Sequence, residues 1–255
     1  AKQIGLVWED MNKPGKEKNV AGSGGVVVVL SAMIGIFLYI AVQTFYFKTS
    51  EGISIQIFAL LSSMFLVTLV GLIDDLFGWR KGGLSKRSRI ILVLFSAIPL
   101  MIINAGDSTI LGINLGILYP LIVVPIGILG ATTTFNFLAG YNGLESGQGI
   151  LILSALAFVA YATGSPWLSI VALCMVASLF AFYIFNKYPA RVFPGDVLTY
   201  SVGMMIAAIA ILGNIEKIAL FFFIPYMLET ILKIRGKLEK QSFGKPIKDG
   251  SLEMP

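Results

Sequence analysis

The sequence predicts an all-α membrane protein whose chain crosses the bilayer several times. Of its 255 residues, 56% are hydrophobic and only 13% are charged, and the mean hydropathy is +0.86. Long apolar segments recur along the chain, and the basic residues between them gather on one side. This composition is far from that of a soluble globular protein and is typical of a polytopic membrane protein.

Eight apolar segments approach the roughly 20 residues that a transmembrane helix needs. The predicted spans lie at about 25–47, 53–73, 88–104, 118–135, 148–163, 167–186, 197–213 and 216–234. The fourth contains Pro120 and Pro125, which interrupt helical hydrogen bonding. The residues before it, 108–117, combine turn glycines with β-branched side chains and predict a short β-hairpin on the extracytoplasmic side.

The basic residues predict the orientation. When the loops alternate across eight spans, only Lys48 and Lys217 fall on one side, which leaves 17 of the 19 Lys and Arg residues on the other. The positive-inside rule makes the basic side cytoplasmic. A single Lys or Arg on this side can be explained by membrane orientation and contact with anionic lipid, without a role in an active site.

The residue types restrict the chemistry. The chain has no histidine and one cysteine, Cys174, which excludes a histidine general base, histidine-ligated zinc and an internal disulfide. Carboxylates, amides, Lys and Arg remain, and hard oxygen ligands of this kind favour Mg²⁺, with Mn²⁺ as a substitute.

Asp74 and Asp75 form an acidic pair at the end of the second predicted span. Adjacent carboxylates repel each other, so the pair indicates a nearby cation, either a metal or one of Arg80, Lys81 and Lys86 in the following loop. The alternative is a solvated helix end, which the helix dipole disfavours for an acid.

A run from Asn136 to Gly143 follows the fourth span, with Glu145 just beyond it. Asn136 and Asn142 offer amide oxygens and N–H groups that can bind a metal or read a base edge. The glycines of the run allow a phosphate or nucleotide to approach the backbone closely. An ordinary Asn-Gly turn is the alternative.

Two further motifs precede spans on the same side. Phe193-Pro-Gly-Asp196 presents Asp196 at a helix entrance, either for function or as an N-cap, and Arg191 nearby could bind a phosphate or serve orientation. Gly24 lies in a glycine-rich segment at the start of the first span. Its free N–H groups could bind an anion, or the glycines could simply make the entry to the helix flexible.

Glu229 in the eighth span is a functional candidate or the i,i+4 partner of Lys233.

Together these motifs resemble the polyprenyl-phosphate N-acetylhexosamine-1-phosphate transferases. The similarity is greatest to the eukaryotic and archaeal UDP-GlcNAc:dolichyl-phosphate enzymes. The matching runs are Asp10-Met-Asn-Lys13, Asp74-Asp75, Asn136-Phe-Leu-Ala-Gly-Tyr-Asn-Gly-Leu-Glu145 and Asn186-Lys-Tyr-Pro-Ala-Arg-Val-Phe-Pro-Gly-Asp196. One departure is Thr133, where the family often has an Asn.

The resemblance implies roles for these residues. Asn136 and Asp196 would hold Mg²⁺, Asp74 and Asp75 would lie at the reacting phosphates, and Lys86 would neutralise the pyrophosphate. Asn142 would contact the uracil, and Glu145, Arg191 and Gly24 would complete the substrate site.

The implied reaction transfers GlcNAc-1-phosphate from UDP-GlcNAc to a polyprenyl or dolichyl phosphate at the cytoplasmic face, the first step of lipid-linked oligosaccharide synthesis for N-glycosylation. The membrane would be the plasma membrane in a prokaryote and the endoplasmic reticulum in a eukaryote. The implied partners are UDP-GlcNAc, the lipid phosphate and membrane lipid, with no nucleic acid and with a homodimer as an assembly to test. A family fold of about ten spans implies that residues 1–255 are one catalytic domain cut at both ends.

Two other function classes are weighed against this one. A sibling enzyme would transfer phospho-N-acetylmuramoyl-pentapeptide, but such wall enzymes typically carry an acid where Ala139 stands. A transporter predicts ionisable residues near span centres and an inverted repeat. Here the acids gather at one face and no repeat is visible.

Overall fold

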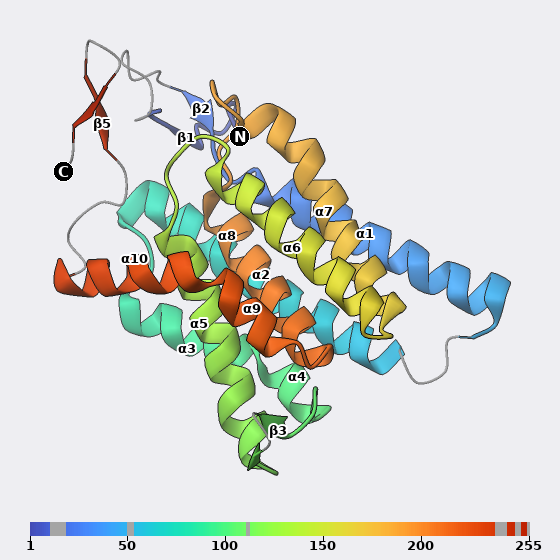
Figure 1. Ribbon diagram of the computed structural model, residues 1–255. Coiled ribbons are helices and arrows are strands. Elements are labelled where there is room, and N and C mark those ends of the chain that lie inside the picture. Colours follow the sequence, from blue (N-terminus) through green and yellow to red (C-terminus); the bar gives the residue numbers. More distant parts are fainter. Residues whose placement is uncertain (11–18, 50–53, 111–112, 238–243, 248–250, 254–255) are drawn as a thin grey trace.

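A computed structural model describes residues 1–10, 19–49, 54–110, 113–237, 244–247 and 251–253. Within this part the protein is a bundle of helices with three two-stranded sheets at its ends (Figure 1). The helices are α1 (Gly25–Val42), η1 (Gln43–Phe47), α2 (Ser54–Lys81), α3 (Lys86–Ser96), α4 (Ile98–Ile102), η2 (Tyr119–Val123), α5 (Val124–Phe137), α6 (Leu144–Ala162), α7 (Pro166–Asn186), α8 (Gly195–Leu212), α9 (Glu216–Phe222) and α10 (Ile224–Arg235). The strands are β1 (Val7–Trp8), β2 (Val20–Ala21), β3 (Thr109–Ile110), β4 (Ile113–Asn114), β5 (Lys245–Pro246) and β6 (Leu252–Glu253). Each pair is antiparallel.

Six helices in the described part are long and apolar enough to cross a membrane, which is fewer than the eight predicted. They are Gly25–Phe47, Ser54–Gly78, Tyr119–Phe137, Leu144–Ala162, Pro166–Asn186 and Gly195–Leu212. Large apolar side chains, among them Phe45, Leu151 and Phe158, remain exposed on the outer helix faces. Exposed apolar surface of this extent fits contact with lipid, and the chain is an integral, multi-pass membrane protein.

The two predicted spans that differ, 88–104 and 216–234, are each divided into two shorter helices. The break precedes Pro99 between α3 and α4, and Pro225 between α9 and α10. Proline lacks the N–H of a helical hydrogen bond, and its ring clashes with the preceding turn, so the helix restarts there. The proline-containing fourth span forms η2 and α5 as one continuous apolar element, as predicted.

The predicted β-hairpin is confirmed as β3 and β4, with Thr109 paired to Asn114; its residues 111–112 lie outside the described part. It lies at the end of the bundle opposite to β1 and β2 (Figure 1). The α3–α4 pair therefore returns the chain from one end of the bundle to the other although neither helix is long enough alone.

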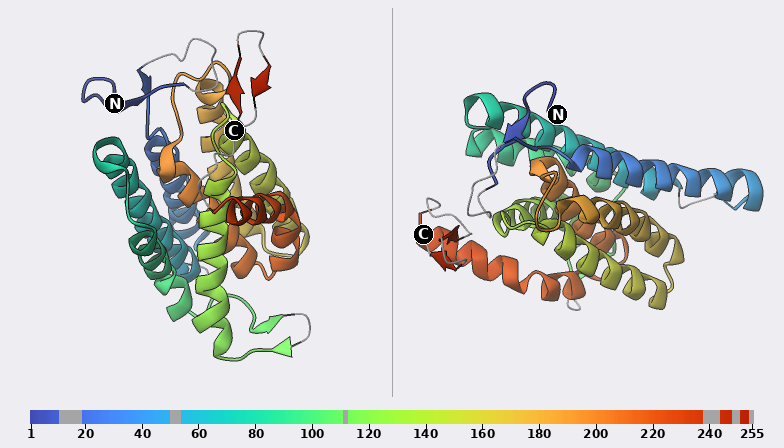
Figure 2. Two further views of the ribbon diagram at one scale, coloured as in Figure 1. Left: turned by 90° about the vertical axis from the view of Figure 1, so that its left-hand side faces the viewer. Right: turned by 90° about the horizontal axis from the view of Figure 1, so that it is seen from above.

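Helix α8 forms the centre of the bundle. Every residue from Val197 to Leu212 is buried, because α8 packs against α1, α2, α5, α6, α7 and α9. An apolar helix face in a membrane protein can meet lipid or other helices, and the burial of α8 shows that it meets other helices. Seen from above, α1 and α2 line one side of the molecule and α10 the opposite side (Figure 2).

Close packing of α8 against α5 depends on Gly203. A Cβ at this position would lie 2.6 Å from the carbonyl oxygen of Ala131 and 2.8 Å from the Cα of Thr132. We expect Gly203→Ala to lower stability by about 1–3 kcal/mol, because the two backbones would have to separate. Thermal unfolding in detergent measures this effect.

Gly130 provides the matched control for Gly203. It lies in α5 itself, and a Cβ there would meet no atom within 4 Å. Gly130→Ala should leave the unfolding temperature unchanged or slightly raised, since alanine favours helix. Equal effects of the two substitutions would show that the α5–α8 contact does not determine stability.

Candidate active site

A polar pocket of about 710 Å³ lies where α2 and α5 end and where α6 and α8 begin. Six of the predicted site residues line it: Asp74, Asp75, Asn136, Asn142, Glu145 and Asp196. These residues come from motifs as far apart as the second and seventh predicted spans. The structure thus brings together the three polar motifs that the sequence predicted to share one face of the membrane.

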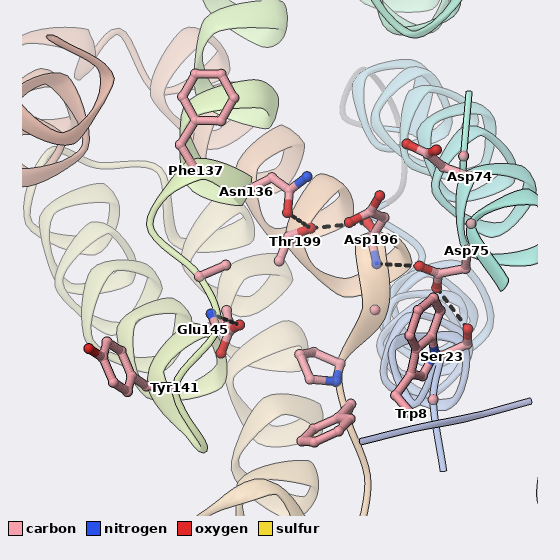
Figure 3. A pocket seen from close by; sticks show the side chains of 18 of the residues that line it. Trp8, Ser23, Asp74, Asp75, Asn136, Phe137, Tyr141, Glu145, Asp196 and Thr199 are labelled. Carbon is pink, nitrogen blue, oxygen red and sulfur yellow. Dashed lines mark hydrogen bonds between the residues drawn. The ribbon is translucent and has the colours of Figure 1, made fainter. Parts of the chain in front are cut away.

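The carboxylate of Asp75 connects three segments of the pocket. Its Oδ1 accepts a hydrogen bond from the backbone N–H of Asp196 at 2.7 Å, and its Oδ2 accepts one from the hydroxyl of Ser23 at 2.8 Å. Gly195 has a φ of +70°, and a Cβ on it would collide with this carboxylate. Glycine is therefore required for the Pro-Gly turn to bring Asp196 against Asp75. Figure 3 shows Asp75 between Ser23 and the backbone of Asp196.

Asp196 is not the N-cap of α8, which was the alternative interpretation. The helix begins at Gly195 with Pro194 in the N-cap position, so Asp196 lies inside the first turn. Its side chain faces the pocket, next to Asp74 and Asp75 in Figure 3. A function within the pocket is the interpretation that fits this position.

Asp74 is buried, with 2% of its surface exposed. Its Oδ2 forms an ion pair of 2.6 Å with Arg89 and accepts a hydrogen bond from the Tyr200 hydroxyl at 3.1 Å. Its Oδ1 accepts a hydrogen bond from the N–H of Leu84 at 2.8 Å. The predicted second span ended at residue 73, but α2 continues to Lys81, so Asp74 and Asp75 lie inside the helix and not at a solvated end. The cationic partner of Asp74 is Arg89 of α3, which was not among the basic residues predicted for this role.

Asn136 lies on the other side of Asp196. The hydroxyl of Thr199 donates to Asn136 Oδ1 at 3.3 Å or to the carbonyl oxygen of Asp196 at 3.2 Å, so one side chain lies between the two predicted metal ligands. Figure 3 shows Asn136, Thr199 and Asp196 in this order. A carbonyl oxygen has two acceptor sites, so the Asn136 amide can accept this bond and still approach a cation.

The donor set of the pocket fits a hard cation. Its described lining has five carboxylates against two basic side chains, and one of those, Arg89, is paired with Asp74. No three Asp, Glu, Cys or His side chains in the described residues are gathered closely enough to hold an ion by themselves. A cation between Asp196 and Asn136 would therefore need oxygen atoms from substrate or water, which is how Mg²⁺ usually binds with phosphate ligands.

The loop between α5 and α6 provides the second side of the pocket. Glu145 Oε1 accepts the N–H of Gly140 at 2.8 Å, while its Oε2 is buried and has no hydrogen-bond partner among the described residues. Asn142 Nδ2 donates to the buried Asp10 at 3.0 Å. An unpaired buried acceptor is costly, so Glu145 fits a ligand N–H or O–H donor. Lys13, at the end of the Asp10 motif, lies outside the described part.

Three predicted site residues are not in the pocket lining: Lys86, Arg191 and Gly24. Lys86 and Arg191 are exposed. The N–H of Gly24 donates to the carbonyl of Phe193 at 2.9 Å, so it is not the free anion donor that the sequence suggested. A Cβ on Gly24 would collide with Phe182 and Val192, which indicates a packing role.

Two basic residues in the pocket were not predicted as site residues. Arg89 was interpreted as an orientation signal, and Lys233 as an orientation signal or the i,i+4 partner of Glu229. Arg89 lies about one helical turn after Lys86 on α3, so the two side chains share a face of the helix. This spacing could have indicated Arg89 as an alternative to Lys86. Lys233 of α10 lies outside the six apolar spans. Burial lowers the pKa of Lys233, and the charge of Glu229 opposes this shift.

Comparison with known proteins places this site in a family. The sequence description of glycosyl transferase family 4 matches residues 57–214, which include both aspartates of the acidic pair, Asn136 and Asp196. The chain belongs to glycosyl transferase family 4. This confirms the family predicted from the motifs.

Named relatives of this family 4 chain refine the comparison. A protein of Saccharolobus solfataricus, provisionally named UDP-N-acetylglucosamine–dolichyl-phosphate N-acetylglucosaminephosphotransferase, is 37% identical over 99% of this chain and 76% of its own length. A Dictyostelium discoideum protein named UDP-N-acetylglucosamine–dolichyl-phosphate N-acetylglucosaminephosphotransferase is 30% identical over 91% of this chain and 65% of its own length. A phospho-N-acetylmuramoyl-pentapeptide-transferase of Streptococcus pneumoniae is 29% identical over 87% of this chain and 68% of its own.

Proposed function

We propose that this family 4 chain transfers GlcNAc-1-phosphate from UDP-GlcNAc to a polyprenyl or dolichyl phosphate. The products would be GlcNAc-diphospho-polyprenol and UMP, in the first step of lipid-linked oligosaccharide synthesis for N-glycosylation. The observation that carries the proposal is the gathering of Asp74, Asp75, Asn136 and Asp196 in one pocket at the end of a membrane-spanning bundle. The names of the more similar relatives support the same donor and acceptor.

The chemistry that the pocket must support is a phosphoryl transfer. An oxygen of the lipid phosphate forms a bond to the β-phosphorus of the donor. The bond from that phosphorus to the oxygen bridging the two phosphates breaks, and UMP leaves with this oxygen. Such reactions depend mainly on in-line positioning and on neutralising charge. The lipid phosphate is already ionised at neutral pH, so no histidine base is needed.

The residues divide these tasks. Asn136 and Asp196 would hold Mg²⁺, which when bound neutralises charge on the donor pyrophosphate. Asp75 fixes the backbone of Asp196, and Arg89 holds Asp74 at the edge of the pocket. Asn142 and Glu145 lie on the α5–α6 side, where they would contact the uridine or the sugar.

The membrane side of the pocket follows from the basic residues. Asp74, Asn136 and Asp196 lie at the same end of the bundle, as the alternation of eight crossings predicted. The α3–α4 pair makes this possible, because it carries the chain from this end to the opposite end before α5 returns. With the positive-inside rule, this end faces the cytoplasm, where nucleotide sugars are available. The membrane would be the plasma membrane of a prokaryote or the endoplasmic reticulum of a eukaryote.

One assay tests the proposal. The full-length protein, purified in detergent, is given UDP-GlcNAc, dolichyl phosphate and Mg²⁺, and UMP release is measured with and without EDTA. We expect release that needs both the lipid and the metal, with Mn²⁺ as a partial substitute. Absence of release with every UDP-sugar and lipid phosphate from a folded preparation would contradict the proposal.

The sibling activity is an outcome of the same assay. Release with UDP-N-acetylmuramoyl-pentapeptide but not with UDP-GlcNAc would keep the reaction and change the donor. The lower identity to the S. pneumoniae protein, and Ala139 in place of an acid, favour UDP-GlcNAc.

A further inference from the structure

Lys233 contributes a cationic side chain to the lining of the pocket and has no role in the reaction proposed for the other lining residues. It lines the pocket from α10, and its Nζ lies 5.1 Å from the centre of the Phe137 ring. Phe137 directly follows Asn136, and Figure 3 shows its ring on the side of Asn136 away from Asp75. Lys233 therefore lines the pocket beside Phe137, the residue that follows the predicted metal ligand Asn136.

The position of Lys233 is fixed by the packing of α10. Tyr226 is buried, its hydroxyl donates to Gln148 at 2.8 Å, and its ring stacks on Phe135 and Phe223 at 5.2 and 4.8 Å. Lys233 follows Tyr226 by seven residues, which is close to two helical turns, so both lie on the same face of α10. The face that packs on α5 therefore carries Lys233 toward the pocket.

The other face of α10 is apolar and exposed. It carries Met227, Leu228, Ile231, Leu232 and Ile234. In a membrane protein such a face lies against lipid chains. Helix α10 thus carries Lys233 toward the pocket on one face and this apolar surface on the other. A ligand that reaches both has a hydrocarbon chain and an anionic head.

The two basic side chains of the described pocket lining differ in their partners. Arg89 is paired with the carboxylate of Asp74. The ammonium of Lys233 lies over the Phe137 ring and near the charge of Glu229, one turn earlier on α10. A cation–π contact is weaker than a charge-assisted hydrogen bond to phosphate. A phosphate entering from the membrane could therefore replace the ring as the partner of Lys233.

We propose that Lys233 binds the phosphate group of the polyprenyl phosphate acceptor and positions it at the entrance of the pocket. This inference rests on the proposed function, since it assigns the acceptor site of the same reaction. The donor phosphates, by contrast, belong on the side of Asp196 and Asn136. Lys233 lies outside residues 57–214, the stretch that matches the family description.

Binding and kinetics together test this assignment. Binding of polyprenyl phosphate and of the uncharged polyprenol of equal length is measured on full-length protein in nanodiscs, for wild type, Lys233→Met and Lys233→Arg. We expect wild type to prefer the phosphate form, Lys233→Met to bind it about tenfold more weakly, and Lys233→Arg to keep most of the preference. In the UMP assay Lys233→Met should raise KM for the lipid and leave KM for UDP-GlcNAc unchanged.

Lys237→Met is the matched control, because Lys237 is exposed just after the same helix. It should behave as wild type, which separates a specific site from general attraction to anionic lipid. Retention of the phosphate preference in Lys233→Met, or a rise in KM for UDP-GlcNAc instead, would overturn the assignment. If wild type released no UMP with any donor, the proposed function would fail, while the binding comparison would still decide the role of Lys233.

Discussion

Replacing Asp196 by Asn should reduce UMP release by about a thousandfold or more, the loss typical for a group that stabilises transition-state charge. Asp196 lies inside the first turn of α8, with its backbone N–H held by Asp75 and with Asn136 beside Thr199 on its other side. The substitution keeps the shape of the side chain and removes the charge that would hold Mg²⁺. Single-turnover UMP release at saturating substrate measures the effect, and raising Mg²⁺ should recover little of it.

A carboxylate at the opposite end of the bundle controls for this experiment. Asp107 precedes β3, and Asp107→Asn should leave UMP release unchanged. An Asp196→Asn protein that folds as wild type and retains more than about a tenth of the rate would remove Asp196 from the metal site. Equal losses in both variants would point to a general effect of charge.

Arg89→Met should have the second largest effect and should lower both stability and activity. The guanidinium of Arg89 is the ion-pair partner of Asp74, whose side chain is 1% exposed, while Arg89 itself is 31% exposed. Removing one partner of a largely buried pair leaves an uncompensated carboxylate, which costs about 2–3 kcal/mol at a partly exposed site. We expect a lower unfolding temperature and UMP release reduced by about a hundredfold.

Lys86→Met tests the assignment that sequence reasoning favoured. Lys86 is one turn earlier on α3, exposed and outside the pocket lining. Its replacement should change UMP release little, which would assign the charge-balancing role to Arg89. A large loss in the Lys86 variant with a small loss in the Arg89 variant would contradict the role inferred from the Arg89–Asp74 ion pair.

The sequence alone was sufficient for the class of protein and for most of the site. Apolar segments, separated by basic loops, predicted a multi-pass helical membrane protein because lipid requires every backbone polar group to be satisfied within a helix. Asp74, Asp75, Asn136 and Asp196 could be selected because acids and amides next to membrane spans are costly and therefore informative. The β3–β4 hairpin could be predicted from turn glycines and β-branched residues alone.

Tertiary structure decided which helices are continuous and which basic residues face the pocket. Pro99 and Pro225 divide two of the predicted spans, whereas the span that contains Pro120 and Pro125 remains continuous. A proline in the sequence therefore does not decide by itself whether a helix is divided. Arg89 and Lys86 are equivalent as charges in a loop, and only the rotation of α3 against Asp74 distinguishes them. From the sequence, Lys233 was interpreted as an orientation signal or as the i,i+4 partner of Glu229. Only the packing of Tyr226 on Phe135 and Gln148 turns it toward the pocket, since contacts between distant segments depend on the whole fold.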